Sequence, residues 1–172
     1  MIRLNNGIEI PQMGAGTWTL RDENATNNVC MALQAGFRHI DTAQMYENEI
    51  EVGKGMINSG VAREEIFLTT KVAPPIMREG EEAVRKSIDE SLMKLNTPYI
   101  DLMLIHWPVK ECVRFTWRVM ESYVKEGKIG SIGVSNFNPN HLVDLLSYAE
   151  IRPVIKSDRG TPLSVASGEH RI

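Results

Sequence analysis

The sequence has little cysteine, no concentrated positive charge and no long apolar run. Its two cysteines, Cys30 and Cys112, stand far apart without CxxC spacing, so they form neither a disulfide framework nor a zinc signature. The 19 basic and 22 acidic residues give a net charge of -3 and are spread along the chain, which leaves no basic block to bind nucleic-acid phosphates. No apolar stretch approaches the roughly 20 residues that span a bilayer, and the N-terminus does not resemble a leader. We therefore expect no nucleic-acid or membrane partner and a cytoplasmic location.

The order of the predicted elements indicates an α/β fold. Hydrophobic residues make up 42% and charged residues 24% of the chain, as is usual for one globular domain. Alternating residues around Asn6-Gly7 predict an opening β-hairpin. Periodicity then predicts strands at 12–17, 37–41, 66–71, 99–106 and 129–134, helices at 23–35, 50–59, 79–95, 113–126 and 140–148, and the start of a sixth strand at 152–155.

Alternating strands and helices favour a mostly parallel sheet, either open and doubly wound or closed as an eight-stranded barrel. A doubly wound nucleotide-binding sheet should carry G-x-G-x-x-G after its first strand. The segment Met13-Gly14-Ala15-Gly16-Thr17-Trp18-Thr19 lacks the third glycine. This absence weakens the doubly wound alternative.

Polar residues follow four successive predicted strands. These are Asp41, Lys71, His106 and the pair Ser135-Asn136. In a parallel barrel the C-terminal strand ends converge on one mouth, which is where barrel enzymes place their chemistry. We therefore expect these residues to form one site.

Tyr46 lies five residues after Asp41 and can overhang the same mouth. A phenol exchanges its proton poorly at neutral pH, but a neighbouring Lys71 ammonium would favour the phenolate, and Asp41 would keep that ammonium protonated. His106 can orient a carbonyl while Tyr46 donates a proton to its oxygen. This apparatus suits carbonyl reduction and requires a cofactor that delivers hydride.

These residues lie in motifs that resemble the aldo-keto reductase family. The resemblance covers about residues 1–155. Its motifs are Gly16-Thr17-Trp18, the segment from Asp41 to Glu49, Thr70-Lys71, the segment from Leu104 to Pro108, and the segment from Gly127 to Phe137.

The resemblance implies a (β/α)8 barrel of the TIM type with an N-terminal hairpin below it, and NADPH as the cofactor. It implies a catalytic tetrad of Asp41, Tyr46, Lys71 and His106, with Tyr46 as the general acid. It also implies that Ser135 and Asn136 bind the nicotinamide carboxamide and that Thr17 and Asp41 lie near the cofactor. Trp18 and Trp107 would form walls of the substrate site, together with Tyr46 and His106.

The barrel pattern stops after about five βα units and the start of strand six. A complete barrel takes about 250 residues. We therefore predict a partial barrel at 1–155 and a tail at 156–172 outside the family pattern. Codons for Lys156 onward can be chosen so that one deleted base restores Asn-Gln-Ile-Glu-Val-His, which suggests a frameshift in the gene.

An incomplete barrel has an unpaired strand edge and uncovered apolar surface. We therefore expect low stability, self-association through the open edge and weak or absent activity. Two alternatives remain. One is a non-catalytic nicotinamide-binding fragment, and the other is a metal-dependent barrel hydrolase with His39, Asp41 and His106 as ligands.

Overall fold

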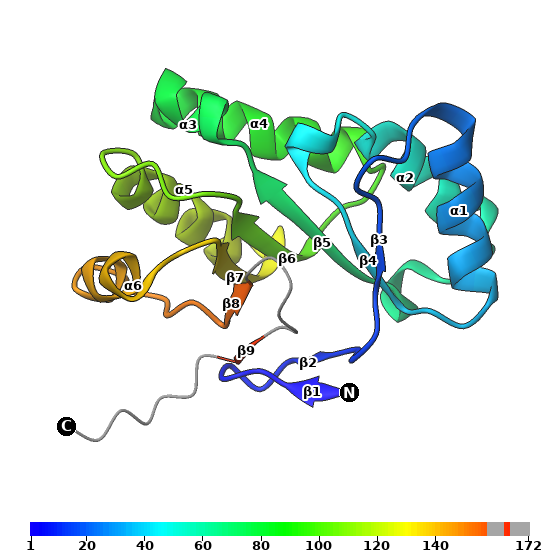
Figure 1. Ribbon diagram of the computed structural model, residues 1–172, viewed down its shortest axis with the longest axis horizontal. Helices are drawn as coiled ribbons and strands as arrows, with labels where there is room; N and C mark the ends of the chain where they lie inside the picture. Colours follow the sequence, from blue (N-terminus) through cyan, green and yellow to red (C-terminus); the bar gives the residue numbers. More distant parts are fainter. Residues whose placement is uncertain (158–163, 166–172) are drawn as a thin grey trace.

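The computed structural model describes residues 1–157 and 164–165 as a short hairpin and one larger sheet (Figure 1). The sheet has seven strands in the order β3-β4-β5-β6-β7-β8-β9, parallel from β3 to β8 and antiparallel between β8 and β9. The hairpin strands are β1 (Ile2–Arg3) and β2 (Glu9–Ile10), and the sheet strands are β3 (Ala15–Gly16), β4 (His39–Asp41), β5 (Phe67–Val72), β6 (Ile100–Ile105), β7 (Ile129–Ser135), β8 (Ile155–Ser157) and β9 (Ser164–Val165).

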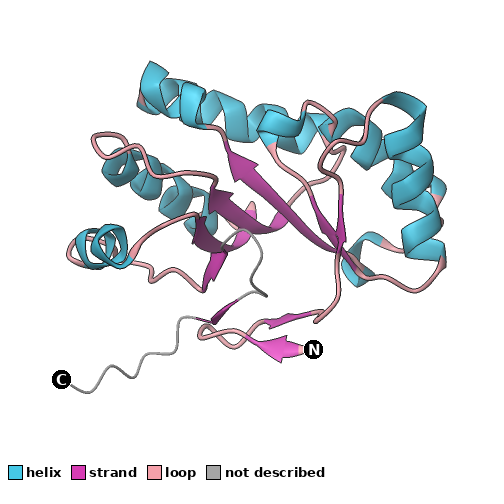
Figure 2. Ribbon diagram, in the orientation of Figure 1, coloured by secondary structure: helices cyan, strands magenta, loops and turns pink. Residues whose placement is uncertain are grey.

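Helices connect the parallel strands and lie around the outside of the curved sheet, with the hairpin on its other side (Figure 2). They are α1 (Asp22–Gln34), the 3-10 turn η1 (Gln44–Tyr46), α2 (Glu49–Asn58), the 3-10 turn η2 (Arg63–Glu65), α3 (Pro74–Glu79), α4 (Glu81–Lys94), α5 (Val113–Lys125) and α6 (Pro139–Leu146). No helix in the described part of the chain is both long and apolar enough to cross a membrane.

This architecture confirms the predicted incomplete (β/α)8 barrel, with five βα units and the start of a sixth strand. Among the described residues, β3 has no strand neighbour except β4, so the sheet stays open at that edge. Several boundaries differ from the predicted ones, and three of these differences change the description of an element. The first strand is reduced to Ala15–Gly16, and the sixth strand begins at Ile155 instead of at 152. The predicted helix at 79–95 is α4, and an unpredicted helix, α3, precedes it, with Gly80 at a φ of 110° between the two.

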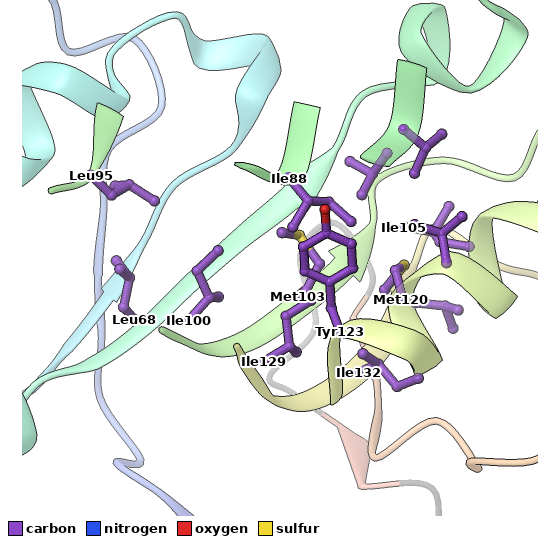
Figure 3. Packing of buried hydrophobic residues seen from close by; sticks show 14 of the residues in the cluster. Leu68, Ile88, Leu95, Ile100, Met103, Ile105, Met120, Tyr123, Ile129 and Ile132 are labelled. Carbon is purple, nitrogen blue, oxygen red and sulfur yellow. The ribbon is translucent and has the colours of Figure 1, made fainter. Parts of the chain in front are cut away.

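The alternation of side chains along each strand produces two apolar cores, one on each face of the sheet. Along β6, Met103 and Ile105 point outward under the helices, where they join the larger core (Figure 3). Leu102 and Leu104 point inward and join a smaller core that includes residues of the hairpin, Leu4 among them. The inner face of the sheet is therefore filled with side chains near the hairpin.

Trp117 on α5 is the largest fully buried side chain of the outer core. Its indole Nε1 donates a hydrogen bond of 3.1 Å to the carbonyl oxygen of Ile151, in the segment that leads into β8. The side chain therefore joins α5 to the last part of the described chain through both packing and a polar contact.

Two side-chain hydrogen bonds attach the hairpin to distant parts of the chain, one to the segment before β8 and one to β7. Asn5 donates to the carbonyl oxygen of Pro153 at 3.0 Å, and Asn6 donates to the Ser131 hydroxyl at 2.9 Å. Gly7 completes the turn with a φ of 88°, a conformation that glycine adopts without steric cost. These contacts place the hairpin beneath the inner core.

The predicted tail at 156–172 falls largely outside the described residues, so its boundary and the frameshift remain predictions. Cys30 and Cys112 are half-buried free thiols.

Candidate active site

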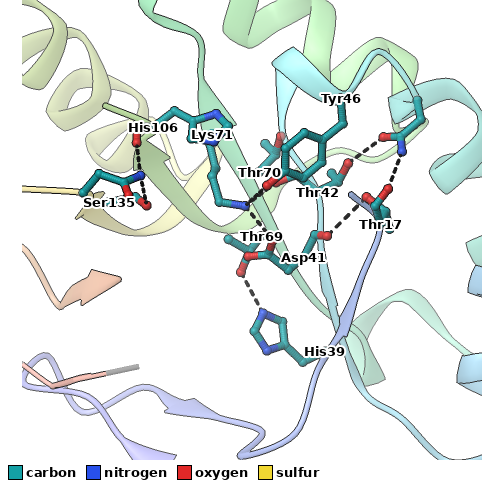
Figure 4. Close-up of polar contacts among 12 residues, drawn as sticks. Thr17, His39, Asp41, Thr42, Tyr46, Thr69, Thr70, Lys71, His106 and Ser135 are labelled. Carbon is teal, nitrogen blue, oxygen red and sulfur yellow. Dashed lines mark hydrogen bonds and ion pairs between the residues drawn. The ribbon is translucent and has the colours of Figure 1, made fainter. Parts of the chain in front are cut away.

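Four of the predicted site residues point to the same face of the sheet because they share one position in the strand repeat. Phe67 and Thr69 on β5 point inward, so Lys71, two residues further on, does so as well. The same two-residue alternation on the neighbouring strands directs three other side chains to the inner side: Asp41 at the end of β4, His106 just after β6 and Ser135 at the end of β7 (Figure 4). The structure thus brings together side chains that lie far apart in the sequence.

The Lys71 ammonium is the centre of this group. It is 5% exposed, and its Nζ donates to the Asp41 carboxylate at 2.5 Å, to the Thr42 carbonyl oxygen at 2.8 Å and to the Tyr46 hydroxyl at 3.5 Å. An ammonium has three N–H donors, and each has an acceptor here. Lys71 can therefore stabilise negative charge on the Tyr46 oxygen, while the Asp41 carboxylate balances the positive charge of Lys71.

Tyr46 lies at the end of η1 and is nearly buried. The Trp18 ring meets the Tyr46 ring edge to face at a centroid distance of 5.0 Å, and the His106 ring does so at 5.6 Å. Such edge-to-face contacts fix ring orientation. The phenol is thereby held between the Lys71 ammonium and the rings of Trp18 and His106.

The surroundings of His106 favour the neutral form of its imidazole. Burial, aided by the nearby Lys71 charge and partly opposed by Asp41, lowers the pKa of His106 to about 4. Its Nδ1 is buried and has no hydrogen-bond partner within the described part of the chain. A neutral imidazole carries one donor and one acceptor nitrogen, so His106 can donate a hydrogen bond to a substrate oxygen without carrying charge.

The depressed pKa of His106 predicts a loss of stability in acid. Between pH 6.5 and about 4 the folded state binds fewer protons at His106 than the unfolded state, so the free energy of unfolding falls as the pH falls. We expect His106→Gln to reduce this fall by on the order of 2 kcal/mol between pH 7 and pH 4. Urea unfolding at a series of pH values measures it.

Two other buried groups also affect the pH dependence of stability. Burial lowers the pKa of His39 and raises the pKa of Glu49. These two shifts change the free energy of unfolding in opposite directions as the pH falls. Both groups are present in the variant and in the parent, so the difference between the two curves reports on His106. Parallel curves would contradict the prediction.

Ser135 and Asn136 offer the donor and acceptor groups that a carboxamide requires. The Asn136 amide nitrogen donates to the His106 carbonyl oxygen at 2.9 Å and to the Ser135 hydroxyl at 3.0 Å. Since the Ser135 oxygen accepts this bond, its own proton stays available for a ligand acceptor. Asn136 adopts a φ of 61°, in the left-handed region that asparagine tolerates better than most residues. The pair fits a nicotinamide carboxamide.

The remaining predicted binding residues, Thr17, Trp18 and Trp107, differ from one another in how exposed they are. The Thr17 side chain is buried, and its hydroxyl donates to the Asp41 carbonyl oxygen at 3.2 Å, so it supports the site from below. Trp18 is 63% exposed at the mouth, and Trp107 is half-buried just after His106. Trp18 is therefore available to contact a ligand.

The sequence patterns did not predict a set of buried polar residues behind the tetrad. Asn48 bonds Thr42, and the Glu49 carboxyl accepts hydrogen bonds from the Thr70 hydroxyl at 2.7 Å and the Ser91 hydroxyl at 3.2 Å. Burial raises the pKa of Glu49. Asn48-Glu49 carried no local sign of burial, because polar residues are usual at the start of a helix, whereas here both side chains are buried.

His39 does not join the group. It points to the same face of the sheet as Asp41 but lies two residues earlier on β4, where its Nε2 contacts the Thr69 hydroxyl at 2.9 Å (Figure 4). Residues 1–157 and 164–165 contain no group of three or more His, Cys, Asp or Glu side chains suited to hold a metal ion. The geometry thus gives no support to the metal-dependent hydrolase.

A cavity of about 800 Å³ lies at the opposite end of the strands. The hairpin and the segments before β4 and β5 line it, with Glu9, Phe37, Glu65 and Asp101 among the lining residues. None of the predicted site residues contributes to it. The cavity is therefore separate from the tetrad.

Known proteins resemble this chain in sequence and in fold. The family model described as "Aldo/keto reductase family" matches residues 12–170. Glyoxal reductase of Bacillus subtilis is 46% identical over 155 residues, which cover 90% of this chain and 55% of that protein.

Two solved structures extend the comparison. An aldo-keto reductase from a Medee basin deep-sea metagenome library has a TM-score of 0.88 and 42% identity, over 92% of this chain and 58% of that one. An aldo-keto reductase of Bombyx mori in complex with NADP has a TM-score of 0.81 and 38% identity, over 91% of this chain and 57% of that one. The chain spans little more than half the length of these relatives. On the family model, the sequence identity and the shared fold, it belongs to the aldo/keto reductase family.

Proposed function

We propose that this chain carries the catalytic half of an NADPH-dependent reductase of aldehydes and ketones. The observation that supports this most strongly is the Lys71 ammonium, which contacts both the Asp41 carboxylate and the Tyr46 hydroxyl next to a neutral His106. A carbonyl oxygen that gains negative charge needs a proton donor and a nearby positive charge. This group of residues supplies both.

Each residue has one task in the proposed reaction. His106 donates a hydrogen bond that orients the carbonyl oxygen, and Tyr46 transfers its hydroxyl proton to that oxygen as the alcohol forms. Lys71 stabilises the resulting phenolate, which regains a proton from solvent. Bound NADPH supplies the hydride that the carbonyl carbon receives.

The chemistry of the side chains and the resemblance to the family support the cofactor and substrate residues of this proposal. Ser135 and Asn136 would hold the nicotinamide carboxamide, while Thr17 and Asp41 would line the cofactor side. The relative crystallised with NADP supports NADPH as the cofactor. Trp18 and Trp107 would contact the substrate, and the relative named glyoxal reductase supports small carbonyl compounds as candidates.

The test is oxidation of NADPH at 340 nm by the purified 172-residue chain, with glyoxal or benzaldehyde as substrate and Tyr46→Phe as the control. Turnover that the control lacks would support the proposal. If specific activity also rises with protein concentration, copies of the chain complete the site by self-association at the open edge. NADPH binding without turnover would instead favour the non-catalytic nicotinamide-binding fragment.

A further inference from the structure

The turn that carries Tyr46 is too short to hold its own orientation. η1 spans Gln44–Tyr46, and its backbone bonds run from Tyr46 N to Ala43 O at 2.9 Å and from Glu47 N to Gln44 O at 3.2 Å. A single turn of this kind is marginal in water without tertiary contacts. The position of the Tyr46 hydroxyl must therefore depend on what anchors the turn at each side.

Gln44, two residues before Tyr46, anchors the first side. Its Oε1 accepts a hydrogen bond of 2.9 Å from the backbone N–H of Ala73, which follows Lys71 by two residues. Its Nε2 donates to the Ser87 carbonyl oxygen, the Ser87 hydroxyl and the Ser91 hydroxyl at 3.1 to 3.2 Å. The amide thus fixes η1 against both α4 and the end of the strand that carries Lys71.

Asn48, two residues after Tyr46, anchors the other side and is 1% exposed. Its Oδ1 accepts from the Thr42 hydroxyl at 2.9 Å, and its Nδ2 donates to the carbonyl oxygens of Thr17 at 2.9 Å and Leu20 at 3.0 Å. The Thr42 carbonyl oxygen is also an acceptor for Lys71. Asn48 therefore links the turn to the lysine site and to the loop that presents Trp18.

We propose that Gln44 and Asn48 are positioning residues that clamp η1 from both sides and hold the Tyr46 hydroxyl beside Lys71. The clamp acts through the backbone of η1. Its effect on catalysis rests on the proposed carbonyl reduction. A displacement of about 1 Å at a reacting group is enough to reduce rate roughly 100-fold. Each amide has its polar atoms paired, so replacing either one loosens one side of the turn.

The clamp can be tested without turnover by NMR of the chain labelled with [13Cζ]tyrosine. The chain has four tyrosines, and Tyr46→Phe assigns the Tyr46 signal. We expect Asn48→Ala and Gln44→Met to shift and broaden the Tyr46 signal while the other three stay in place. Gln34→Ala, an amide change at an exposed position on α1, is the matched control and should move none of them.

If Asn48→Ala does not fold, the Tyr46 signal of Gln44→Met tests the clamp. A methionine side chain has nearly the same length as a glutamine side chain but cannot form the hydrogen bonds of the amide. An unchanged Tyr46 signal in the folded variants would overturn the proposal, as would equal shifts of all four signals. With an active parent, kcat should fall about 10- to 100-fold while KM changes less than about threefold. An inactive parent would count against the proposed function alone, since the Tyr46 signal still tests the clamp.

Discussion

Replacement of Tyr46 by phenylalanine is expected to reduce kcat for carbonyl reduction about 1000-fold with little change in KM. A positioned general acid typically contributes a factor of about 100 to 10,000. Phenylalanine keeps the ring that packs against Trp18 and His106 and removes only the hydroxyl next to Lys71. Steady-state NADPH oxidation with varied aldehyde concentration separates kcat from KM.

Tyr148→Phe provides the matched control for the Tyr46 prediction. The Tyr148 hydroxyl is buried and has no hydrogen-bond partner among the residues that the structure describes, and its ring lies against Arg114 away from the tetrad. Its removal should change kcat less than about twofold. Equal rates for Tyr46→Phe and the parent would show that another group donates the proton.

Truncation of Trp117 to alanine should destabilise the fold by about 3 to 5 kcal/mol. Its side chain is fully buried among the outer-core residues of α5, and its removal also leaves the Ile151 carbonyl oxygen without its indole donor. Typical domains are stable by only about 5 to 15 kcal/mol, so a large share of the available stability would be lost. Urea unfolding followed by circular dichroism at 222 nm measures the change.

Trp117→Phe separates the two causes of this loss. Phenylalanine fills much of the same volume but cannot donate to Ile151, so its cost should stay near that of one hydrogen bond plus a small cavity, about 1 to 2 kcal/mol. A Trp117→Ala variant that unfolds at the same urea concentration as the parent would refute the packing argument.

The convergence of Asp41, Lys71 and His106 could be predicted from the sequence because these residues follow a strand repeat. Asp41, Lys71 and His106 each close a short apolar run, and in parallel strands such ends meet at one edge. The opening hairpin was equally accessible, because Asn6-Gly7 is a strong local turn signal. Predictions succeeded where a local pattern determines the position of a side chain.

The hydrogen bonds that surround the tetrad join residues far apart in the sequence, so no local pattern could predict them. Gln44 bonds residues on α4 more than 40 positions away, and Asn48 bonds a carbonyl oxygen 31 positions before it. His39 shows a related limit. The strand repeat gives the direction of a side chain but not its depth, so the repeat alone could not separate His39 from the tetrad.

The hairpin contacts described above have a consequence for the order of folding during synthesis. The Asn5 amide binds the Pro153 carbonyl oxygen, a separation of 148 residues. A ribosome adds about 5 to 20 residues each second, so the hairpin is synthesised roughly 7 to 30 s before that partner exists. Because such distant contacts slow folding, the first segment to be synthesised is among the last to dock.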